Sequence, residues 1–324
     1  MQKIALVTGG AGFIGSHMVD LLLKKNYKVR VIDNFLGGRE ENLSDHKKNR
    51  NLILENFDIR NSEKYISFFK DVSYFYHFAG IGDIVPSIEN PVEYFSVNVQ
   101  GTVVLMEMIR HLKKINKLVY AASSSCYGVA ETPTNEEHPI NPLYPYALSK
   151  FQGEMIVKHY SKVYNIPINI IRIFNAYGPK VRTTGAYGAV FGVFFKQKLS
   201  GAPLTVVGDG NQKRDFVYVT DVVTAFYLAA KTKIKNEIWN LGGGNPITIN
   251  YLVNLIKCKS VEYLPKRPSE PDCTWADISK IKKDLNWRPE ITFKEGVNNM
   301  LNEIEKWKDA PLWNREKIDK ATKV

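Results

Sequence analysis

Short apolar runs rich in β-branched residues recur along the first half of the chain, and several of them are continuous rather than alternating with polar residues. Strands buried on both faces of a parallel sheet have this pattern. The runs are 4–7, 29–32, 52–54, 74–76, 118–120 and 168–174. Helical patterns lie between them, as in 16–25 and 98–113. This alternation predicts an α/β fold with a doubly wound, parallel Rossmann sheet.

The pattern changes after about residue 175, where Pro and Gly interrupt shorter segments. Residues 216–241 nevertheless have the pattern of a helix followed by a strand, which indicates a return to the first domain. We therefore expect residues 1–175 and about 212–245 to form the Rossmann domain. About 176–211 and 246–324 should form a smaller, mostly C-terminal α/β domain that binds the substrate.

Composition excludes several classes of protein. Of the 324 residues, 44% are hydrophobic and 24% are charged, which is typical of a soluble globular chain. The net charge of +11 comes without a run of five basic residues, so it indicates a lysine-rich surface or a phosphate-bearing substrate rather than nucleic acid. Three cysteines without CxxC or zinc spacing predict no metal site. With no apolar run of about 18 residues, we expect no membrane span and a cytoplasmic location.

The first predicted strand runs into three glycines spaced three residues apart, Gly9, Gly12 and Gly15. Gly9 permits a tight turn, Gly12 lets a diphosphate approach the backbone, and Gly15 lets the next helix pack closely on the strand. The start of that helix offers unpaired N–H groups and a positive dipole end to phosphate. We expect a dinucleotide at this turn, in contact with Phe13 and Ile14.

The second predicted strand ends in Asp33 and Asn34, 18 residues past Gly15. A carboxylate at this distance along the chain accepts hydrogen bonds from an adenosine ribose and repels a 2′-phosphate. The sequence therefore predicts NAD rather than NADP as the cofactor, with both residues beside it. Arg39 nearby is a minor argument for NADP.

Tyr146 and Lys150 are four residues apart, so on a helix they share one face. Ser123 follows the strand predicted at 118–120, and strand ends over the crevice are where doubly wound folds act. A nearby ammonium and an oxidised nicotinamide favour the phenolate of Tyr146, which then takes a proton from a sugar hydroxyl while hydride leaves the same carbon. Ser123 would bond the same oxygen, and Lys150 would hold the nicotinamide ribose. These three are the catalytic candidates.

A series of motifs along the chain resembles, in its order, that of one protein family. The motifs are 8–17, 33–34, 57–59, 77–80, the serine run 123–125, Tyr146 with Lys150, 172–175, 214–221 and 275–278. Together they look like the extended short-chain dehydrogenase/reductase family of nucleotide-sugar enzymes, and the resemblance runs nearly end to end. It implies that the Rossmann domain binds NAD and that the smaller domain binds a nucleotide sugar.

The resemblance also implies further binding residues. Beside the cofactor it implies Asp58 and Ile59 at the adenine, and Phe78, Ala79, Gly80 and Asn98 along the dinucleotide. At the substrate it implies Ser87, Ser123, Ser124, Asn175, Arg214, Arg267 and Thr274. Three of these have ordinary structural alternatives: a turn cap for Asn175, an ion pair with Asp215 or Asp221 for Arg214, and a solvated loop for Arg267.

The turn after Ser123 narrows the reaction. In this family, 4,6-dehydratases carry an Asp-Glu pair there and UDP-glucuronate decarboxylases carry a Glu, whereas this chain has Ser124, Ser125 and Cys126. What remains is 4-epimerisation: oxidation at C4, rotation of the 4-keto sugar and return of the hydride. The stretch is similar to that of UDP-N-acetylglucosamine 4-epimerases, with Cys126 read as a packing residue. Thr274, a small side chain before Trp275, predicts room for an N-acetyl group.

The sequence thus predicts an NAD-dependent 4-epimerase acting on UDP-glucose/UDP-galactose and on UDP-GlcNAc/UDP-GalNAc. Alternatives are a UDP-glucuronate 4-epimerase, a dehydratase or decarboxylase of the family, and, from another class, a non-catalytic NAD-sensing binding protein. The resemblance implies a homodimer or homotetramer, assembled through the helices near 98–113 and 146–163.

Overall fold

A seven-stranded, wholly parallel sheet forms the centre of the larger domain in this computed structural model, which describes residues 2–181, 190–266 and 271–321. The strand order is β11-β6-β5-β4-β1-β2-β3. The strands are β1 (Ile4–Thr8), β2 (Lys28–Asp33), β3 (Leu52–Asn56), β4 (Tyr74–His77), β5 (Lys117–Ser123), β6 (Ile168–Ile173) and β11 (Glu237–Leu241). This confirms the predicted doubly wound fold. The strand order reverses between β1 and β4, which is where such sheets open a binding crevice.

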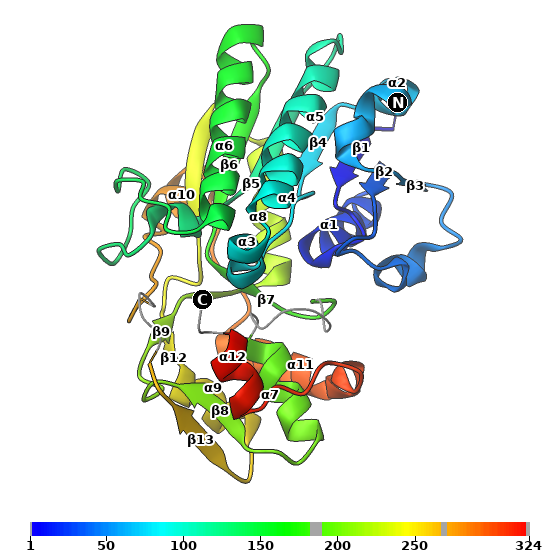
Figure 1. The fold of residues 1–324 in the computed structure, drawn as a ribbon. Helices are drawn as coiled ribbons and strands as arrows, with labels where there is room; N and C mark the ends of the chain where they lie inside the picture. The colour runs from blue at the N-terminus through cyan, green and yellow to red at the C-terminus, as the bar shows by residue number, and fades with distance from the viewer. Residues whose placement is uncertain (1, 182–189, 267–270, 322–324) are drawn as a thin grey trace.

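Helices cover both faces of this sheet (Figure 1). On one face lie α1 (Phe13–Lys24) and α8 (Val219–Lys231), and on the other lie α5 (Gly101–Arg110) and α6 (Pro145–Tyr164). Because strand side chains alternate between faces, Val7 packs in the cluster with Met18 of α1, whereas Leu6 packs with Leu105 of α5. The sheet is therefore buried on both sides, as its continuous apolar runs predict.

Shorter elements complete the larger domain. They are η1 (Glu40–His46), η2 (Ile59–Tyr65), α2 (Ile66–Phe69), α3 (Ile84–Glu89), α4 (Pro91–Phe95), the π-helical turn η3 (Ser96–Gln100), η4 (Ser124–Tyr127) and α10 (Ser279–Leu285). The helix expected over 98–113 differs in its bounds. Helical structure begins at Pro91, a residue whose fixed φ suits the first helical position, and α5 ends at Arg110.

The smaller domain has a hydrophobic core of its own, which includes Phe195, Leu252, Met300 and Trp307. Its two-stranded sheet pairs β8 (Leu204–Val207) with β13 (Val261–Leu264) in parallel. The helices around it are α7 (Val190–Leu199), α9 (Ile249–Ile256), α11 (Phe293–Asn302), η5 (Ile304–Trp307) and α12 (Arg315–Ala321). In Figure 1 this domain lies below the larger one, under the ends of α3 and α1.

Two small strand pairs join the domains: β7 (Asn175–Tyr177) with β10 (Phe216–Tyr218), and β9 (Lys213–Arg214) with β12 (Ile247–Thr248). The expected boundary differs in one segment. Ile278 and Ile281 pack into the core beneath α1 and α8, and the Trp239 indole of β11 donates to Asp284 at 2.9 Å. Residues 276–287 thus pack with the larger domain, because their apolar face completes the layer over β11.

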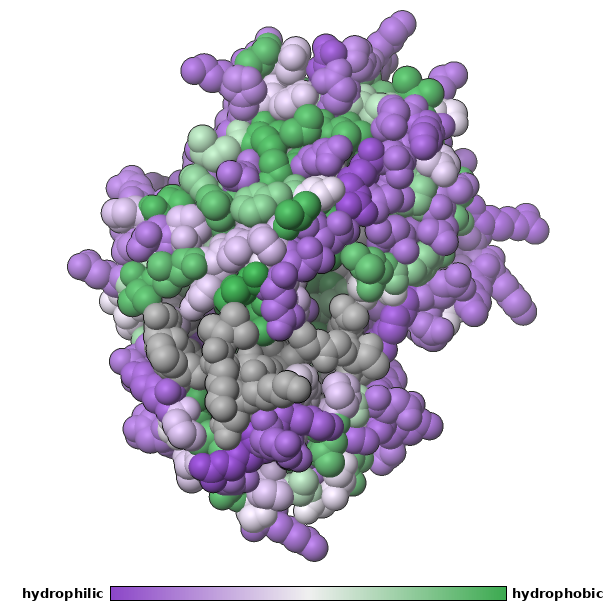
Figure 2. All heavy atoms as spheres, in the orientation of Figure 1, coloured by the Kyte–Doolittle hydropathy of each residue, from purple (hydrophilic) through white to green (hydrophobic). Residues whose placement is uncertain are grey.

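Hydrophilic side chains dominate the outline of the molecule in Figure 2, and hydrophobic ones gather on its upper part, over α5 and α6. Exposed apolar residues of α6 include Leu148, Met155 and Val163. Within the described residues, none of the helices combines the length and the apolar character that a membrane crossing requires.

Candidate active site

The glycine turn forms one wall of the crevice. Gly9 adopts a φ of +68°, and a Cβ on Gly15 would lie 2.1 Å from the Gly9 carbonyl oxygen, so only glycine allows α1 to start this close to β1. Gly12 precedes α1, whose first turn contains no acidic residue and no side-chain cap. Backbone N–H groups at an uncapped helix start are an anion site, so this turn fits the diphosphate of a dinucleotide.

Asp33 lies at the end of β2, next to the glycine turn. Its carboxylate accepts hydrogen bonds from the backbone N–H groups of Ala11 and Phe35, each at 2.9 Å. Burial raises the pKa of Asp33, and these backbone donors lower it in part. Each carboxylate oxygen has two lone pairs, so Asp33 keeps capacity to accept bonds from ribose hydroxyls.

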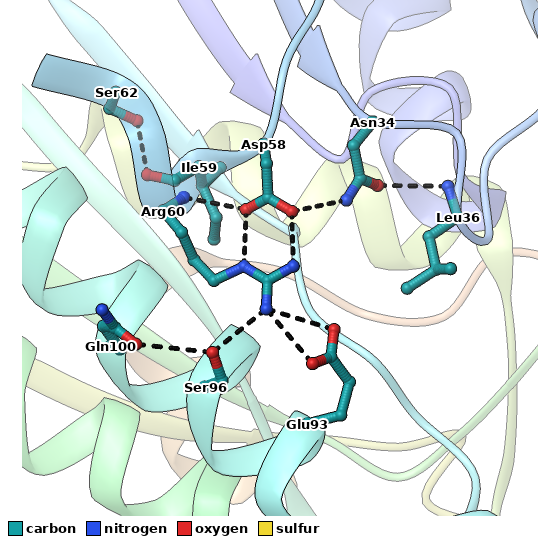
Figure 3. Close-up of polar contacts among 9 residues, drawn as sticks. All are labelled: Asn34, Leu36, Asp58, Ile59, Arg60, Ser62, Glu93, Ser96 and Gln100. Carbon is teal, nitrogen blue, oxygen red and sulfur yellow. Dashed lines mark hydrogen bonds and ion pairs between the residues drawn. The ribbon is translucent and has the colours of Figure 1, made fainter. Parts of the chain in front are cut away.

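Asn34, Asp58 and Arg60 form a polar network at the ends of β2 and β3 (Figure 3). Asp58 accepts a bond from the Asn34 amide at 2.8 Å and from Nε and Nη2 of Arg60 at 2.9 and 2.8 Å. Burial raises the pKa of Asp58, but the bonds from Arg60 and Asn34 outweigh it and hold that pKa below its usual value. Arg60 also contacts Glu93 at 3.2 Å and Ser96 at 3.0 Å.

This network holds this end of the crevice in shape and ties it to α4 and η3. Sequence reasoning missed Arg60, because an arginine two residues after Asp58 is indistinguishable from a solvated one. The signal was the Asp58 side chain itself, because a carboxylate that is only 16% exposed needs a partner.

The three catalytic candidates meet at the other end of the crevice. The Tyr146 phenol oxygen lies 3.3 Å from the Ser123 hydroxyl, which in turn lies 2.8 Å from the Ser125 hydroxyl. Ser123 ends β5, whereas Tyr146 and Lys150 lie in the first turns of α6, after Pro145 at the first helical position. Packing of α6 beside β5 brings the three together.

Burial sets the proton affinities at this end. It raises the pKa of the Tyr146 phenol above its usual value, and the hydrogen bond with Ser123 lowers it in part. Burial also lowers the pKa of Lys150 to about 8, while the Glu154 carboxylate raises it. Ionising Tyr146 near neutral pH therefore requires further positive charge beside the phenol.

Asn98 and His77 support the floor of the site. The Asn98 amide donates to the Ile81 carbonyl at 3.1 Å and to the Ser149 hydroxyl at 2.9 Å, and its oxygen accepts from the Ile81 N–H at 2.9 Å. His77 is buried between the Thr8 and Thr102 hydroxyls at 2.7 and 3.1 Å, and burial lowers its pKa to about 3. Asn98 thus fixes the loop after β4 against α6 rather than lining the crevice itself.

A single cavity of about 570 Å³ contains both ends, a volume ordinary for a small-molecule site. Most of the predicted cofactor and catalytic residues line it: Gly9, Gly12, Phe13, Ile14, Gly15, Asp33, Asn34, Asp58, Ile59, Phe78, Ala79, Gly80, Ser123, Tyr146 and Lys150. Of the predicted substrate residues, Asn175 lines it as well as Ser123. Val181, Val190, Phe191, Phe216 and Met300 line the side formed by the smaller domain, and no sequence motif marks them.

Ser87, Ser124, Arg214 and Thr274 do not line this cavity. Ser87 is buried and donates to the Ile84 carbonyl within α3 at 2.6 Å, which satisfies its hydroxyl inside the helix. The Arg214 guanidinium donates to the carbonyl of Pro271 at 2.9 Å, so backbone acceptors hold part of it. Arg267 lies outside the described residues.

Thr274 acts through a neighbour. Its hydroxyl accepts a bond from the Asn175 amide at 3.0 Å, so it orients a residue that does line the crevice. The Cys126 thiol is buried, and burial raises its pKa to about 12, so it is an unreactive packing group. Among the described residues, no group of three metal-ligating side chains is found.

Comparison with known proteins places this geometry in a family. The profile described as GDP-mannose 4,6 dehydratase matches residues 6–300. A provisionally named UDP-glucose 4-epimerase of Methanocaldococcus jannaschii is 40% identical over 304 residues, which cover 92% of this chain and 97% of that protein.

Two solved structures are similar over nearly the whole chain. One is UDP-glucuronic acid 4-epimerase from Bacillus cereus in complex with UDP-glucuronic acid and NAD, with a TM-score of 0.87 and 33% identity over 94% of this chain and 99% of that one. The other is UDP-N-acetylglucosamine 4-epimerase from Methanobrevibacter ruminantium M1, bound to UDP-N-acetylmuramic acid, with a TM-score of 0.87 and 31% identity over 94% and 98%.

The fold and the crevice define an extended short-chain dehydrogenase/reductase. Within that class, this chain belongs to the GDP-mannose 4,6 dehydratase family of nucleotide-sugar enzymes, among its members of the 4-epimerase type.

Proposed function

We propose that this protein is an NAD-dependent 4-epimerase of UDP-hexoses. The observation that carries the proposal is the 3.3 Å approach of the Tyr146 phenol to the Ser123 hydroxyl, one helical turn from Lys150, in the same cavity as the glycine turn. An acid–base group, a hydroxyl that aligns the substrate and an ammonium are all that reversible oxidation of a sugar hydroxyl needs from the protein.

The glycine turn, Asp33 and Asp58 would hold NAD at the diphosphate, the ribose and the adenine end. When bound there, NAD would supply the hydride acceptor and donor that exchange at C4 requires. Tyr146 takes the proton of the C4 hydroxyl and gives it back, while Ser123 donates to the same oxygen. Burial raises the pKa of the Tyr146 phenol. The ammonium of Lys150, one helical turn further along α6, would favour the phenolate.

The turn after Ser123 argues against dehydration and decarboxylation. Ser124, Ser125, Cys126 and Tyr127 provide no carboxylate there, and the Ser125 hydroxyl is engaged with Ser123 at 2.8 Å. Eliminating water across C5 and C6 needs an acid and a base in addition to the tyrosine, so epimerisation is the reaction these residues support.

For the sugar, we propose UDP-glucose/UDP-galactose, with tolerance of the N-acetyl pair because Thr274 beside Asn175 is small. UDP-glucuronate is the second candidate, favoured by the likeness to the Bacillus cereus enzyme bound to that compound. For the assembly, we propose a homodimer or homotetramer through α5 and α6, where Leu148, Met155 and Val163 are exposed.

The test is turnover of a panel of UDP-sugars followed by NMR identification of the products. We expect inversion at C4 for UDP-glucose, and a loss of turnover of at least about a hundredfold in Tyr146→Phe. Tyr251→Phe, an exposed tyrosine on α9 outside the cavity, is the matched control. NAD binding without turnover of any UDP-sugar would instead identify an NAD-sensing binding protein.

A further inference from the structure

A buried ion pair lies directly behind the catalytic residues. Glu154 is on α6, four residues after Lys150 and eight after Tyr146, so the three side chains follow one another along a single helical face. Arg172 on β6 donates to both Glu154 oxygens, through Nε at 2.9 Å and Nη2 at 2.6 Å. The exposed fractions are 1% for Glu154 and 4% for Arg172.

Arg172 connects α6 to the turn that carries Ser123. Its Nη1 donates to the Tyr127 hydroxyl at 2.8 Å and to the Glu136 carbonyl at 3.2 Å, and the guanidinium lies 5.0 Å from the centre of the Tyr127 ring. Tyr127 ends η4, which begins at the residue after Ser123, and its hydroxyl donates to Asn240 of β11 at 2.8 Å. One guanidinium thus joins α6, which carries Tyr146, to the turn η4, which directly follows Ser123.

We propose that Glu154 and Arg172 are positioning residues, which set the approach of the Tyr146 phenol to Ser123 and the charge around Lys150. This rests on the proposed function, because it assigns Tyr146 and Lys150 their catalytic roles. A need for stability alone would not explain the pair: well-packed apolar residues of similar volume are often as stable as a buried ion pair. What apolar residues cannot provide is a fixed hydrogen-bond geometry across three elements.

Removing the Glu154 charge and removing the Arg172 charge should shift the pKa of Lys150 in opposite directions. Lys150 is faced by Glu154 from its own helix, by the Tyr120 ring from β5 and by neutral His77 from β4. Glu154 is the group among these that raises the pKa of Lys150. Without its carboxylate, Lys150 loses its proton at a lower pH, and without Arg172 the uncompensated carboxylate holds that proton to a higher pH.

The experiment is a set of pH–rate profiles on the full chain with NAD and a UDP-sugar. We expect Glu154→Gln and Arg172→Met each to lower kcat by about tenfold to a hundredfold with little change in KM, because a small misplacement of reacting groups costs that much. The alkaline limb should move to lower pH in Glu154→Gln and to higher pH in Arg172→Met. Arg172→Lys keeps the charge without the two-pronged geometry, so its kcat should fall while its alkaline limb stays in place.

Controls separate positioning from folding and from the proposed function. Glu107→Gln breaks a partly exposed Glu–Arg pair on α5, outside the cavity, and should leave the rate and the profile unchanged. The double variant E154M/R172M replaces the pair by apolar groups, and we expect it to fold, as judged by circular dichroism, but to keep the low kcat. A folded double variant with wild-type kcat and an unmoved alkaline limb would overturn the proposal. Wild-type activity in Tyr146→Phe would instead refute the proposed function.

Discussion

The ammonium nitrogen of Lys150 lies 4.7 Å from the centre of the Tyr120 ring. This cation–π contact stabilises the protonated lysine against burial, which lowers its pKa to about 8. Because the proposed mechanism uses Lys150 as a cation, activity should fall as pH rises through about 8. In Tyr120→Leu the ring is lost, so the alkaline limb of kcat should move down by about one pH unit, the equivalent of about 1.4 kcal/mol.

Tyr120→Phe keeps the ring and serves as the control for this shift, and its alkaline limb should coincide with that of the wild type. Steady-state rates between pH 6 and pH 10 provide the measurement. An alkaline limb that stays in place in Tyr120→Leu would mean that the ring contributes nothing to the proton affinity of Lys150.

Ser123→Ala should lower kcat by about tenfold to a hundredfold, the cost of one hydrogen bond to a charged reacting group. The effect should appear in kcat rather than in NAD affinity, because Ser123 approaches the reacting oxygen. Ser125→Ala is informative beside it, since that hydroxyl touches Ser123 and should cost less. Equal losses in the two variants would argue that the turn, rather than the Ser123 hydroxyl, is what matters.

Asp33→Asn should weaken NAD binding by about tenfold or more, because a charged acceptor for the ribose becomes neutral while two backbone N–H groups lose a charged partner. Binding of NADP should weaken less, since the repulsion of a 2′-phosphate is removed with the charge. Titrations of both dinucleotides followed by tryptophan fluorescence measure the ratio. Asp45→Asn, an exposed carboxylate outside the cavity, should leave the ratio unchanged.

Gly15→Ala should lose NAD binding and about 1–3 kcal/mol of stability, since the new methyl group would lie 2.1 Å from the Gly9 carbonyl oxygen and force α1 away from β1. Gly192→Ala in α7 is the matched substitution, because a Cβ there meets no atom closer than 3.9 Å and the residue does not line the cavity. Thermal unfolding with and without NAD distinguishes them. A Gly15→Ala protein that binds NAD normally would show that α1 can shift without harm.

Thr274→Tyr should lower kcat/KM for UDP-GlcNAc more than for UDP-glucose, because bulk beside Asn175 narrows the sugar end of the crevice. Thr274→Ser keeps the hydroxyl that accepts from Asn175, so it should retain both activities. Competition between the two substrates in one reaction gives the ratio directly. An unchanged ratio in Thr274→Tyr would place the C2 group of the sugar elsewhere.

Local patterns along the chain predicted the sheet, the glycine turn and the three residues Ser123, Tyr146 and Lys150, which line one cavity. Continuous apolar runs indicate strands that are buried on both faces, and the spacing of Gly9, Gly12 and Gly15 indicates a close turn. Both features depend only on residues that are near each other in the sequence. Ser123, Tyr146 and Lys150 were identified as candidates from their residue types and from the predicted strand and helix around them.

Packing of distant segments decided the rest. The pairing of Glu154 with Arg172 across 18 positions, and of Arg60 with Glu93 across 33 positions, depends on which elements lie side by side, which periodicity does not report. The same holds for Met300, which reaches the crevice from helix α11. A site formed within one turn or on one helical face can therefore be predicted from the sequence. The partner of a buried charge cannot, because it depends on which elements pack against each other.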